Sequence, residues 1–268
     1  MKLLFSEAKS DYANYVFPYA IWALPDSGET PADLFDAGFL PSSRDLDRFY
    51  LCRQIRVDLK QYRPSSENRR ILRKGAGIRV RLLTRAEFDF TEARRGFFKK
   101  YADIKFGKDV MTFARLDALF NSKITSHVLQ FEDTANGHEV GTATLFLERP
   151  NLAYYYYAFY DLNYYNRNLG MFMMTSAAEV FSAEKFRHLY LGSCYSENAL
   201  YKAQFAGAEF FNGFRWSSNL KELKFLVGRE KAMPKQHLLE TPEFREKFYD
   251  QEVEKLARLS QFEVKLRK

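Results

Sequence analysis

Cysteine and histidine are scarce in this chain of 268 residues. Its two cysteines, Cys52 and Cys194, lie far apart, and its four histidines show no paired spacing. A disulfide framework needs more cysteines, and a zinc or iron–sulfur site needs ligands at short, regular intervals. We therefore expect no disulfide framework and no metal site, and a reducing, cytoplasmic setting is the default.

Long apolar runs are missing as well. No segment approaches the length of a membrane-spanning helix. The apolar start at residues 1–5 turns polar at Ser6 and Glu7, which is too early for a signal peptide. We expect a cytoplasmic protein with no membrane partner.

Aromatic residues are abundant, with 26 Phe and 17 Tyr, and they favour broad aromatic packing or stacking platforms. Hydrophobic residues make up 46% of the chain, enough for a folded core. The formal net charge of +7 is compatible with an anionic partner but does not require one.

Residues 53–85 form the one strongly basic stretch, with 11 Lys and Arg against two acidic residues. Two interpretations stay open. The stretch is either a solvated surface or a footprint for a phosphate backbone, where clustered cations gain affinity by releasing counterions.

The stretch from residue 153 to 186 combines three elements that together indicate a binding site. It opens with the aromatic run 153–160, which has strong strand propensity. A polar turn at 166–170 contains Gly170, and apolar residues then recur at helical spacing. A strand, a glycine turn and a helix direct backbone N–H groups and a helix N-terminus at one place. We expect the ligand there.

The rest of the pattern predicts a mixed α+β protein. Asn136-Gly137 is a strong hairpin signal, so the strands on either side of it and the aromatic strand should form three antiparallel strands. In chain order, the expected elements are an irregular segment 1–30, a helix 31–38, a strand 49–59, a strand 77–83, helices 84–101 and 112–120, strands 126–131, 139–147 and 153–160, a helix 171–186, a strand 188–192, a helix 198–205, a strand 209–216 and a helix 241–259.

This order of elements resembles the acyltransferase fold called GNAT. The resemblance implies an α+β (α/β mixed) fold, with a mixed, mostly antiparallel central sheet flanked by helices. Most GNAT members bind acetyl-CoA pyrophosphate on the turn before the helix, through a loop of the form Arg/Gln-x-x-Gly-x-Gly/Ala. The turn here supplies one glycine, followed by Met171 and Phe172.

Four blocks in the right order, spread over residues 30–216, resemble the arginyl- and leucyl-tRNA–protein transferases. The blocks are Gly38-Phe39 with 52–57, the stretch 62–73, then 157–162 with 168–171, and 190–192 with 201–205. Two departures stand out. Only Cys52 remains of the family's N-terminal cysteine cluster, and Leu40-Pro41 stands where family members tend to carry basic residues.

The resemblance implies aminolysis of an aminoacyl-tRNA ester by a protein N-terminal α-amine, with Arg or Leu as the transferred group and no cofactor. Its domains would be an aminoacyltransferase-like segment 1–60, a GNAT-like core 61–228 and a helical extension 229–268. Alternatives are a CoA-dependent N-acetyltransferase that uses acetyl-CoA and a non-catalytic binding protein.

The same resemblance assigns site residues. Tyr157 and Asp161 are the candidates for taking the proton from the ammonium, although Tyr157 also suits a core position and Asp161 a turn. The 3′ end of the donor would be held by Asn168, Leu169, Gly170 and Met171. The tRNA phosphates would contact Arg63, Arg69, Arg70 and Arg73, with Lys202 as a weaker helper.

Overall fold

The computed structural model describes residues 1–232, 235–250 and 253–262. The strands are β1 (Lys2–Glu7), β2 (Tyr19–Leu24), β3 (Phe39–Pro41), β4 (Phe49–Leu51), β5 (Gln54–Asp58), β6 (Ile78–Thr84), β7 (His127–Asp133), β8 (His138–Glu148), β9 (Leu152–Tyr160), β10 (His188–Ser193), β11 (Ala208–Phe211) and β12 (Trp216–Ser217). The α-helices are α1 (Pro31–Asp36), α2 (Ser66–Lys74), α3 (Glu92–Lys105), α4 (Phe113–Phe120), α5 (Leu169–Ala183), α6 (Leu220–Lys231), α7 (Pro242–Tyr249) and α8 (Val253–Leu259). Short 3₁₀ segments are η1 (Tyr12–Asn14), η2 (Leu162–Arg167), η3 (Glu197–Gln204) and η4 (Leu238–Glu240).

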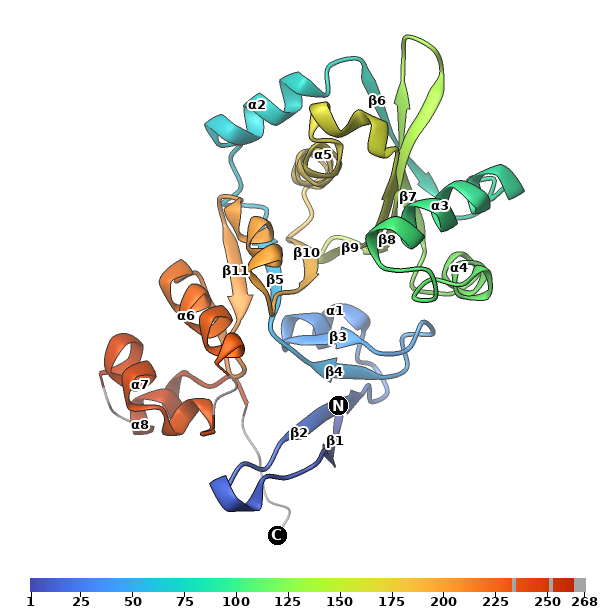
Figure 1. The fold of residues 1–268 in the computed structure, drawn as a ribbon. Coiled ribbons are helices and arrows are strands. Elements are labelled where there is room, and N and C mark those ends of the chain that lie inside the picture. The colour runs from blue at the N-terminus through green and yellow to red at the C-terminus, as the bar shows by residue number, and fades with distance from the viewer. Residues whose placement is uncertain (233–234, 251–252, 263–268) are drawn as a thin grey trace.

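The central sheet has eight strands in the order β12-β11-β5-β10-β9-β8-β7-β6. β9 and β10 are parallel, whereas the other neighbours are antiparallel. The meander β7-β8-β9, the helix α5 and the parallel strand β10 follow one another along the chain (Figure 1). The GNAT-like fold class expected from the sequence, a mostly antiparallel sheet flanked by helices, is confirmed.

Helices cover both faces of the central sheet. α2 and α5 lie on one face, and α3 and α4 lie on the other (Figure 1). Each face has its own hydrophobic core: Phe172 and Phe181 of α5 belong to the first, and Phe98 and Phe120 of α3 and α4 to the second. The aromatic residues of the sequence therefore mostly build these two layers, as in the stacked pair Phe98–Phe159.

Local signals explain several predicted elements. Thr30 caps α1, Pro31 occupies its first turn, and Gly38 follows it with a φ of +95° that suits glycine. The hydroxyl of Thr112 accepts a hydrogen bond from the N–H of Arg115 and caps α4. These two helices, the hairpin β7-β8 and the strands β9 and β10 are confirmed.

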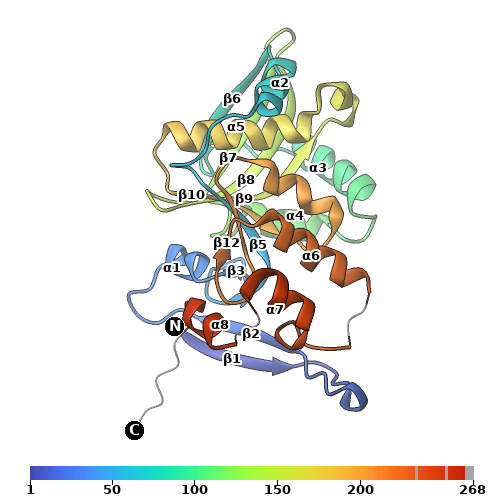
Figure 2. The same ribbon diagram turned by 90° about the vertical axis from the view of Figure 1, so that its left-hand side faces the viewer.

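The irregular segment expected at residues 1–30 is wrong. β1 and β2 form an antiparallel hairpin in register from Lys2↔Leu24 to Glu7↔Tyr19, in a second sheet of order β1-β2-β4-β3. Pro18 and Pro25 stand immediately before and after β2, so they bound the strand instead of interrupting it. This hairpin lies at one end of the molecule (Figure 2).

Several further boundaries differ from the expectation, among them the strand expected at 209–216, which is the two strands β11 and β12. The strand expected at 49–59 is two strands, β4 in the small sheet and β5 in the central one. The helix expected to start at Thr84 is α3, which starts at Glu92, because Thr84 closes a turn with Glu87 instead. The final helix is split after α7, where Asp250 takes a left-handed conformation.

The C-terminal helices are attached to the central sheet by a buried carboxylate. Glu222 of α6 is 1% exposed and accepts hydrogen bonds from Asn212, Ser217 and Tyr249 at 2.6–2.8 Å. β5, from the segment before residue 60, lies between β11 and β10 in the same sheet. No helix in the described residues has both the length and the apolar character needed to cross a membrane.

Candidate active site

β9 and β10 are neighbours over only part of their length. They pair through three residue pairs, His188↔Leu152, Leu189↔Ala153 and Tyr190↔Tyr154. β9 then continues to Tyr160 and β10 to Ser193 with no further pairing between them in the described residues. The strands therefore separate, and their unpaired ends open the centre of the sheet.

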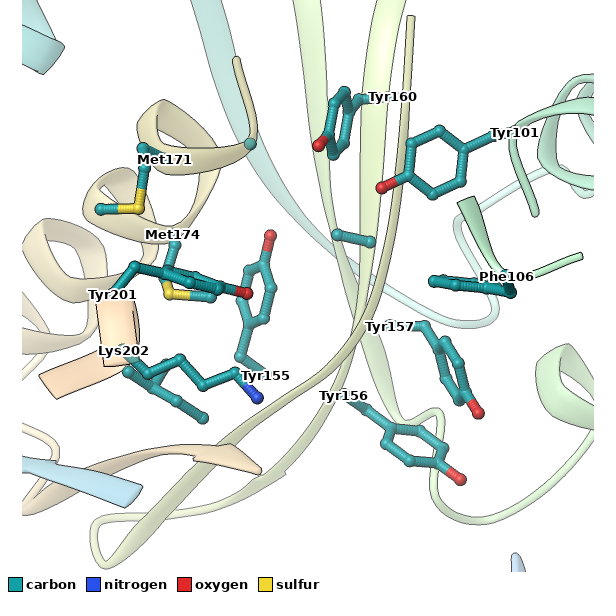
Figure 3. Close-up of a pocket in the computed structure, with 13 residues that line it drawn as sticks. Tyr101, Phe106, Tyr155, Tyr156, Tyr157, Tyr160, Met171, Met174, Tyr201 and Lys202 are labelled. Carbon is teal, nitrogen blue, oxygen red and sulfur yellow. The ribbon is translucent and has the colours of Figure 1, made fainter. Parts of the chain in front are cut away.

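A cavity of about 480 Å³ lies at this separation. Tyr160, Tyr101, Phe106, Tyr157 and Tyr156 line one side, and Met171, Met174, Tyr201, Lys202 and Tyr155 line the other (Figure 3). Ala158, Gly170 and Leu191 complete the wall. Aromatic rings, thioethers and aliphatic groups make up most of this surface, which suits an apolar group with few polar contacts.

A β-bulge in β9 sets the direction of its tyrosines. Ala143 pairs with Ala158 and Leu145 with Tyr155, so Thr144 alone faces both Tyr156 and Tyr157. The N–H of Tyr157 donates to Oγ1 of Thr144 at 3.1 Å. An extra residue breaks the normal alternation of a strand. The rings of Tyr156 and Tyr157 therefore lie on the same side, with centroids 4.6 Å apart.

β10 also carries a bulge at the edge of the cavity. Tyr190 pairs with Arg56 and Gly192 with Ile55, which leaves Leu191 as the extra residue. Leu191 lines the cavity, and Gly192 has a φ of +80°. Immediately beyond, the carbonyl oxygen of Ser193 accepts a hydrogen bond from Nζ of Lys202 at 3.0 Å.

Two polar groups in the wall are held in unusual surroundings. Lys202 is the one residue of the cavity lining with a formal charge, and burial lowers the pKa of its amine. The hydroxyl of Tyr155 is buried and has no hydrogen-bond partner within the described part of the chain. Burial also raises the pKa of Tyr155, with Tyr201 and Tyr160 adding to the effect. A ligand in the cavity would satisfy such a hydroxyl.

The segment predicted to hold the donor lies at the start of α5. Gly170 and Met171 line the cavity, whereas Leu169 is buried and Asn168 precedes the helix in a left-handed conformation, with a φ of 51°. The expected glycine turn at 166–170 is wrong, because η2 and Asn168 make the turn and Gly170 belongs to the first turn of α5. A Cβ at Gly170 would lie 2.9 Å from the hydroxyl of Tyr160, so a close approach of the two elements requires glycine here.

The two predicted catalytic residues lie in different cavities. Tyr157 lines the central cavity. Asp161 lines a second one, of about 280 Å³, which shares Tyr101 and Tyr160 with the first. Oδ1 of Asp161 accepts hydrogen bonds from the backbone and side chain of Asn163, and Oδ2 lies 3.6 Å from Nε2 of His138.

A third cavity, of about 370 Å³, shares Tyr156 and Tyr157 with the central one. Arg44, Arg48 and Arg115 line it together with one carboxylate, Asp45, and we call it the arginine pocket. Arg115 donates to the carbonyl oxygen of Val110, and Arg48 donates to the Ser42 hydroxyl and lies over the ring of Trp22. In the described residues, none of the three forms an ion pair with a carboxylate.

Sequence reasoning missed the arginine pocket. Arg44 and Arg48 lie in the loop between β3 and β4, while Arg115 belongs to α4, and only the fold brings them together. Leu40-Pro41 lacks the basic side chains that the family resemblance leads one to expect, yet Arg44 and Arg48 follow within seven positions.

The arginines predicted to contact tRNA lie on or just before α2. A Cβ on Gly75, at the end of α2, would collide with the ring of Phe172, so α2 packs closely on the start of α5. Arg69 and Arg73 are exposed, with Arg69 donating to the carbonyl oxygen of Pro64.

Two of the other residues predicted to contact tRNA already form contacts within the chain, and the third, Lys202, lies elsewhere. Arg70 is paired with Glu67, and Arg63 donates to the carbonyl oxygens of Lys60 and Tyr62. Lys202 is separate from this surface and lies in the wall of the central cavity. The structure thus puts α2 beside the donor segment but assigns Lys202 to a different environment.

Neither cysteine is placed for metal binding or nucleophilic chemistry. Cys52 and Cys194 are buried free thiols, and burial raises the pKa of Cys52 to about 12. Residues 1–232, 235–250 and 253–262 contain no group of three or more His, Cys, Asp or Glu side chains that could hold a metal ion.

Comparison with known proteins gives weak but consistent similarities. No protein-family model matches the chain. It is 23% identical over 176 residues to an aspartate/glutamate leucyltransferase of Cereibacter sphaeroides, and 25% identical over 182 residues to one of Dinoroseobacter shibae. These alignments cover 62% of this chain and 61% and 62% of the relatives, so the chain matches about three fifths of their length.

Solved structures with a similar fold include FemX, with a TM-score of 0.45 and 11% identity over 76% of this chain and 70% of that one. A GCN5-related N-acetyltransferase from Sphaerobacter thermophilus has a TM-score of 0.39 and 16% identity over 72% of this chain and 56% of its own.

Proposed function

We propose that this protein transfers an apolar aminoacyl group, leucyl above all, from charged tRNA to the α-amine of a protein that begins with Asp or Glu. One observation carries the proposal: an apolar cavity between β9 and β10 lies directly beside the arginine pocket, and the two share Tyr156 and Tyr157. The similarity to proteins named aspartate/glutamate leucyltransferases supports the same substrates.

The reaction is an aminolysis of an activated ester. The amine nitrogen attacks the ester carbonyl carbon, a C–N bond forms, and the C–O bond to the terminal ribose breaks. The ribose oxygen leaves as a hydroxyl and takes up the proton that the amine loses. Holding the amine and the ester in attack geometry is worth several kcal/mol, so the protein needs no covalent intermediate.

The wall of the central cavity favours leucyl over arginyl as the transferred group. No carboxylate lines the cavity, and its one charged residue is Lys202. A guanidinium placed there would lose its hydration and meet a like charge. A leucine side chain would instead bury apolar surface against Tyr155 and Met174, at about 25 cal/mol per Å².

The arginine pocket favours an acidic acceptor. Guanidinium groups bind carboxylates through paired, charge-assisted hydrogen bonds. Arg44 and Arg115 form no ion pair among the residues described, and the three arginines of the pocket outnumber Asp45, the one carboxylate in its lining. Because Tyr156 and Tyr157 separate this pocket from the cavity, an Asp or Glu side chain held by the arginines has its own α-amine beside the ester.

The remaining roles follow the family resemblance. Tyr157 lines both the central cavity and the arginine pocket and is therefore the first candidate for accepting the proton, while Asp161 lines the second cavity. Arg69 and Arg73 of α2 would contact the phosphates of the tRNA acceptor arm, with Arg63 and Arg70 beside them, and the first turn of α5 would adjoin the terminal nucleotide.

A matrix of donors and acceptors tests the proposal. Purified protein is incubated with leucyl-tRNA, arginyl-tRNA or acetyl-CoA, and with peptides that begin with Asp, Asn or N-acetylated Asp. Mass spectrometry should find leucine added to the Asp peptide, less addition to the Asn peptide, and none to the acetylated one. Acetylation from acetyl-CoA without aminoacyl transfer, or preferential transfer of arginine, would contradict the proposal.

A further inference from the structure

We infer that Lys202 is a catalytic residue whose ammonium donates a hydrogen bond to the carbonyl oxygen of the aminoacyl ester as that oxygen becomes an oxyanion. This inference rests on the proposed function and assigns a role to a residue that was expected to bind tRNA phosphates.

The backbone fixes the position of Lys202. It lies on η3, and its Nζ donates to the carbonyl oxygen of Ser193 at the end of β10. A Cβ on Gly192 would lie 3.8 Å from this Nζ, so the amine passes close to the bulge of β10. Figure 3 shows the chain of Lys202 extending toward the middle of the cavity near Tyr155. One N–H is used by Ser193, and an ammonium retains two more for a ligand.

No carboxylate of the described residues pairs with the charge of Lys202. The titratable and charged groups around it are Tyr155, Tyr160, Tyr201, Cys194 and Arg53, and no carboxylate is among them. Burying an amine in this way disfavours its charged form.

Two other lysines of this protein pair with carboxylates. Lys231 pairs with Glu197 of η3 at 2.8 Å, and Lys99 pairs with Asp103. A partly buried lysine without such a carboxylate, in the wall of a cavity, is typical of a functional position.

Tyr155 is the neighbour of Lys202 in the wall of the cavity. The buried hydroxyl of Tyr155 lacks a partner in the described residues and lines the same side of the cavity as Lys202. Figure 3 shows this hydroxyl and Nζ of Lys202 at opposite ends of the Tyr155 side chain, so Lys202 is the donor placed to stabilise charge that develops only in the transition state.

The chemical step gives Lys202 one task. When the amine nitrogen attacks, the carbonyl oxygen gains negative charge and Lys202 stabilises it by donating a hydrogen bond, without losing its proton. As the tetrahedral intermediate collapses, the C–O bond to the ribose breaks, the carbonyl reforms and Lys202 is unchanged. The ammonium is therefore the active form.

The pH dependence of kcat for leucine transfer tests this role. The acceptor α-amine must be neutral to attack, and its ordinary pKa is about 7.7–8.0. The wild-type rate should therefore rise with pH and then fall as Lys202 loses its proton, at a pH below the ordinary value for lysine. Rates are corrected for enzyme-free hydrolysis of the ester.

Three variants complete the experiment. Lys202→Met should lower kcat by about 10²-fold, leave KM for the peptide unchanged and abolish the alkaline fall. Lys202→Arg keeps the positive charge and should move the alkaline fall in kcat to a pH above the measured range. Lys224→Met, at an exposed lysine of α6, is the matched control and should behave as wild type. Thermal unfolding of each variant confirms the fold.

The outcomes separate this inference from the proposed function. If wild-type protein transfers no aminoacyl group, both fail. Suppose that wild-type protein does transfer leucine. If Lys202→Met then lowers kcat by the same factor at every pH and still shows the fall in kcat at alkaline pH, Lys202 has a packing role and the inference is overturned. A wild-type rate that rises through a pKa absent from Lys202→Met would identify a general base and would also overturn it.

Discussion

Tyr154 of β9 and Tyr190 of β10 form the last residue pair before the two strands separate. Up to this pair the central sheet is continuous, and beyond it each strand carries a bulge and the cavity opens. The position of the site is therefore a property of the sheet, and the side chains beyond Tyr154 determine what fits.

Filling the cavity should block transfer with little loss of stability. Ala158 lines the cavity, so Ala158→Phe should place a ring where the leucyl group binds. We expect kcat/KM to fall at least about tenfold, equivalent to ~1.4 kcal/mol, and the free energy of unfolding to fall by at most about 1–3 kcal/mol. Steady-state kinetics and urea unfolding measure the two effects. Ala135→Phe, in the exposed β7-β8 turn, is the control; equal losses in both variants would contradict the assignment.

Charge reversal on α2 should weaken tRNA binding. Each phosphate contact that is lost should reduce the slope of log K against log salt by about one, so Arg69→Glu with Arg73→Glu should reduce it by about two. Filter binding at several salt concentrations gives the slope. Arg79→Glu with Arg81→Glu makes the same change of net charge on β6, where both arginines lie near Glu132. If this control double variant weakens tRNA binding as much as the α2 double variant does, α2 is not the tRNA-binding surface.

The arginine pocket should control acceptor choice. Arg44→Gln with Arg115→Gln removes two guanidinium groups from the pocket and should raise KM for an Asp peptide about tenfold or more, the worth of one lost charge-assisted bond of ~1.5–3 kcal/mol. The Asn peptide provides the control within the same enzyme, because it carries no carboxylate to lose. Parallel changes for both peptides would place the acceptor side chain elsewhere.

Only part of this site was predictable from the sequence. Asn136-Gly137 and Thr112 act on their immediate neighbours, so the hairpin and the start of α4 could be located. The place of Gly170 could not, because Gly170 lies in the first turn of α5 and contacts Tyr160, ten positions earlier, only in the folded protein.

The arginine pocket and the position of Lys202 could not be predicted from the local sequence either. Arg44 and Arg115 converge through packing between a loop and α4, and no local pattern connects them. Lys202 is an ordinary lysine in the sequence, and the bulge of β10 is what brings its amine to the carbonyl of Ser193. The prolines around β2 led to the wrong expectation of an irregular segment at residues 1–30. A proline next to a strand looks the same in sequence as one that breaks it.

His188 should make stability depend on pH. It is 5% exposed, and burial, with Arg56 and Arg187, lowers its pKa to about 4 from an ordinary 6.5. Between these values the unfolded chain binds a proton that the folded protein does not. The free energy of unfolding should therefore fall by about 3 kcal/mol as pH drops from about 7 to about 4.

Urea unfolding of His188→Gln at each pH measures that contribution. In this variant the free energy of unfolding should change less between about pH 7 and about pH 4. His138→Gln, at a side chain that is 57% exposed, is the control and should retain the full change. A change that His188→Gln leaves intact would assign the pH dependence to other groups.

The central claim is that a leucyl group enters the sheet between β9 and β10. A crystal structure with the non-hydrolysable amide analogue of 3′-leucyl-adenosine tests it most directly. We predict the leucine side chain beside Tyr155 and its carbonyl oxygen within hydrogen-bond distance of Nζ of Lys202. An analogue bound at another surface, with the cavity between the two strands unchanged, would contradict the account.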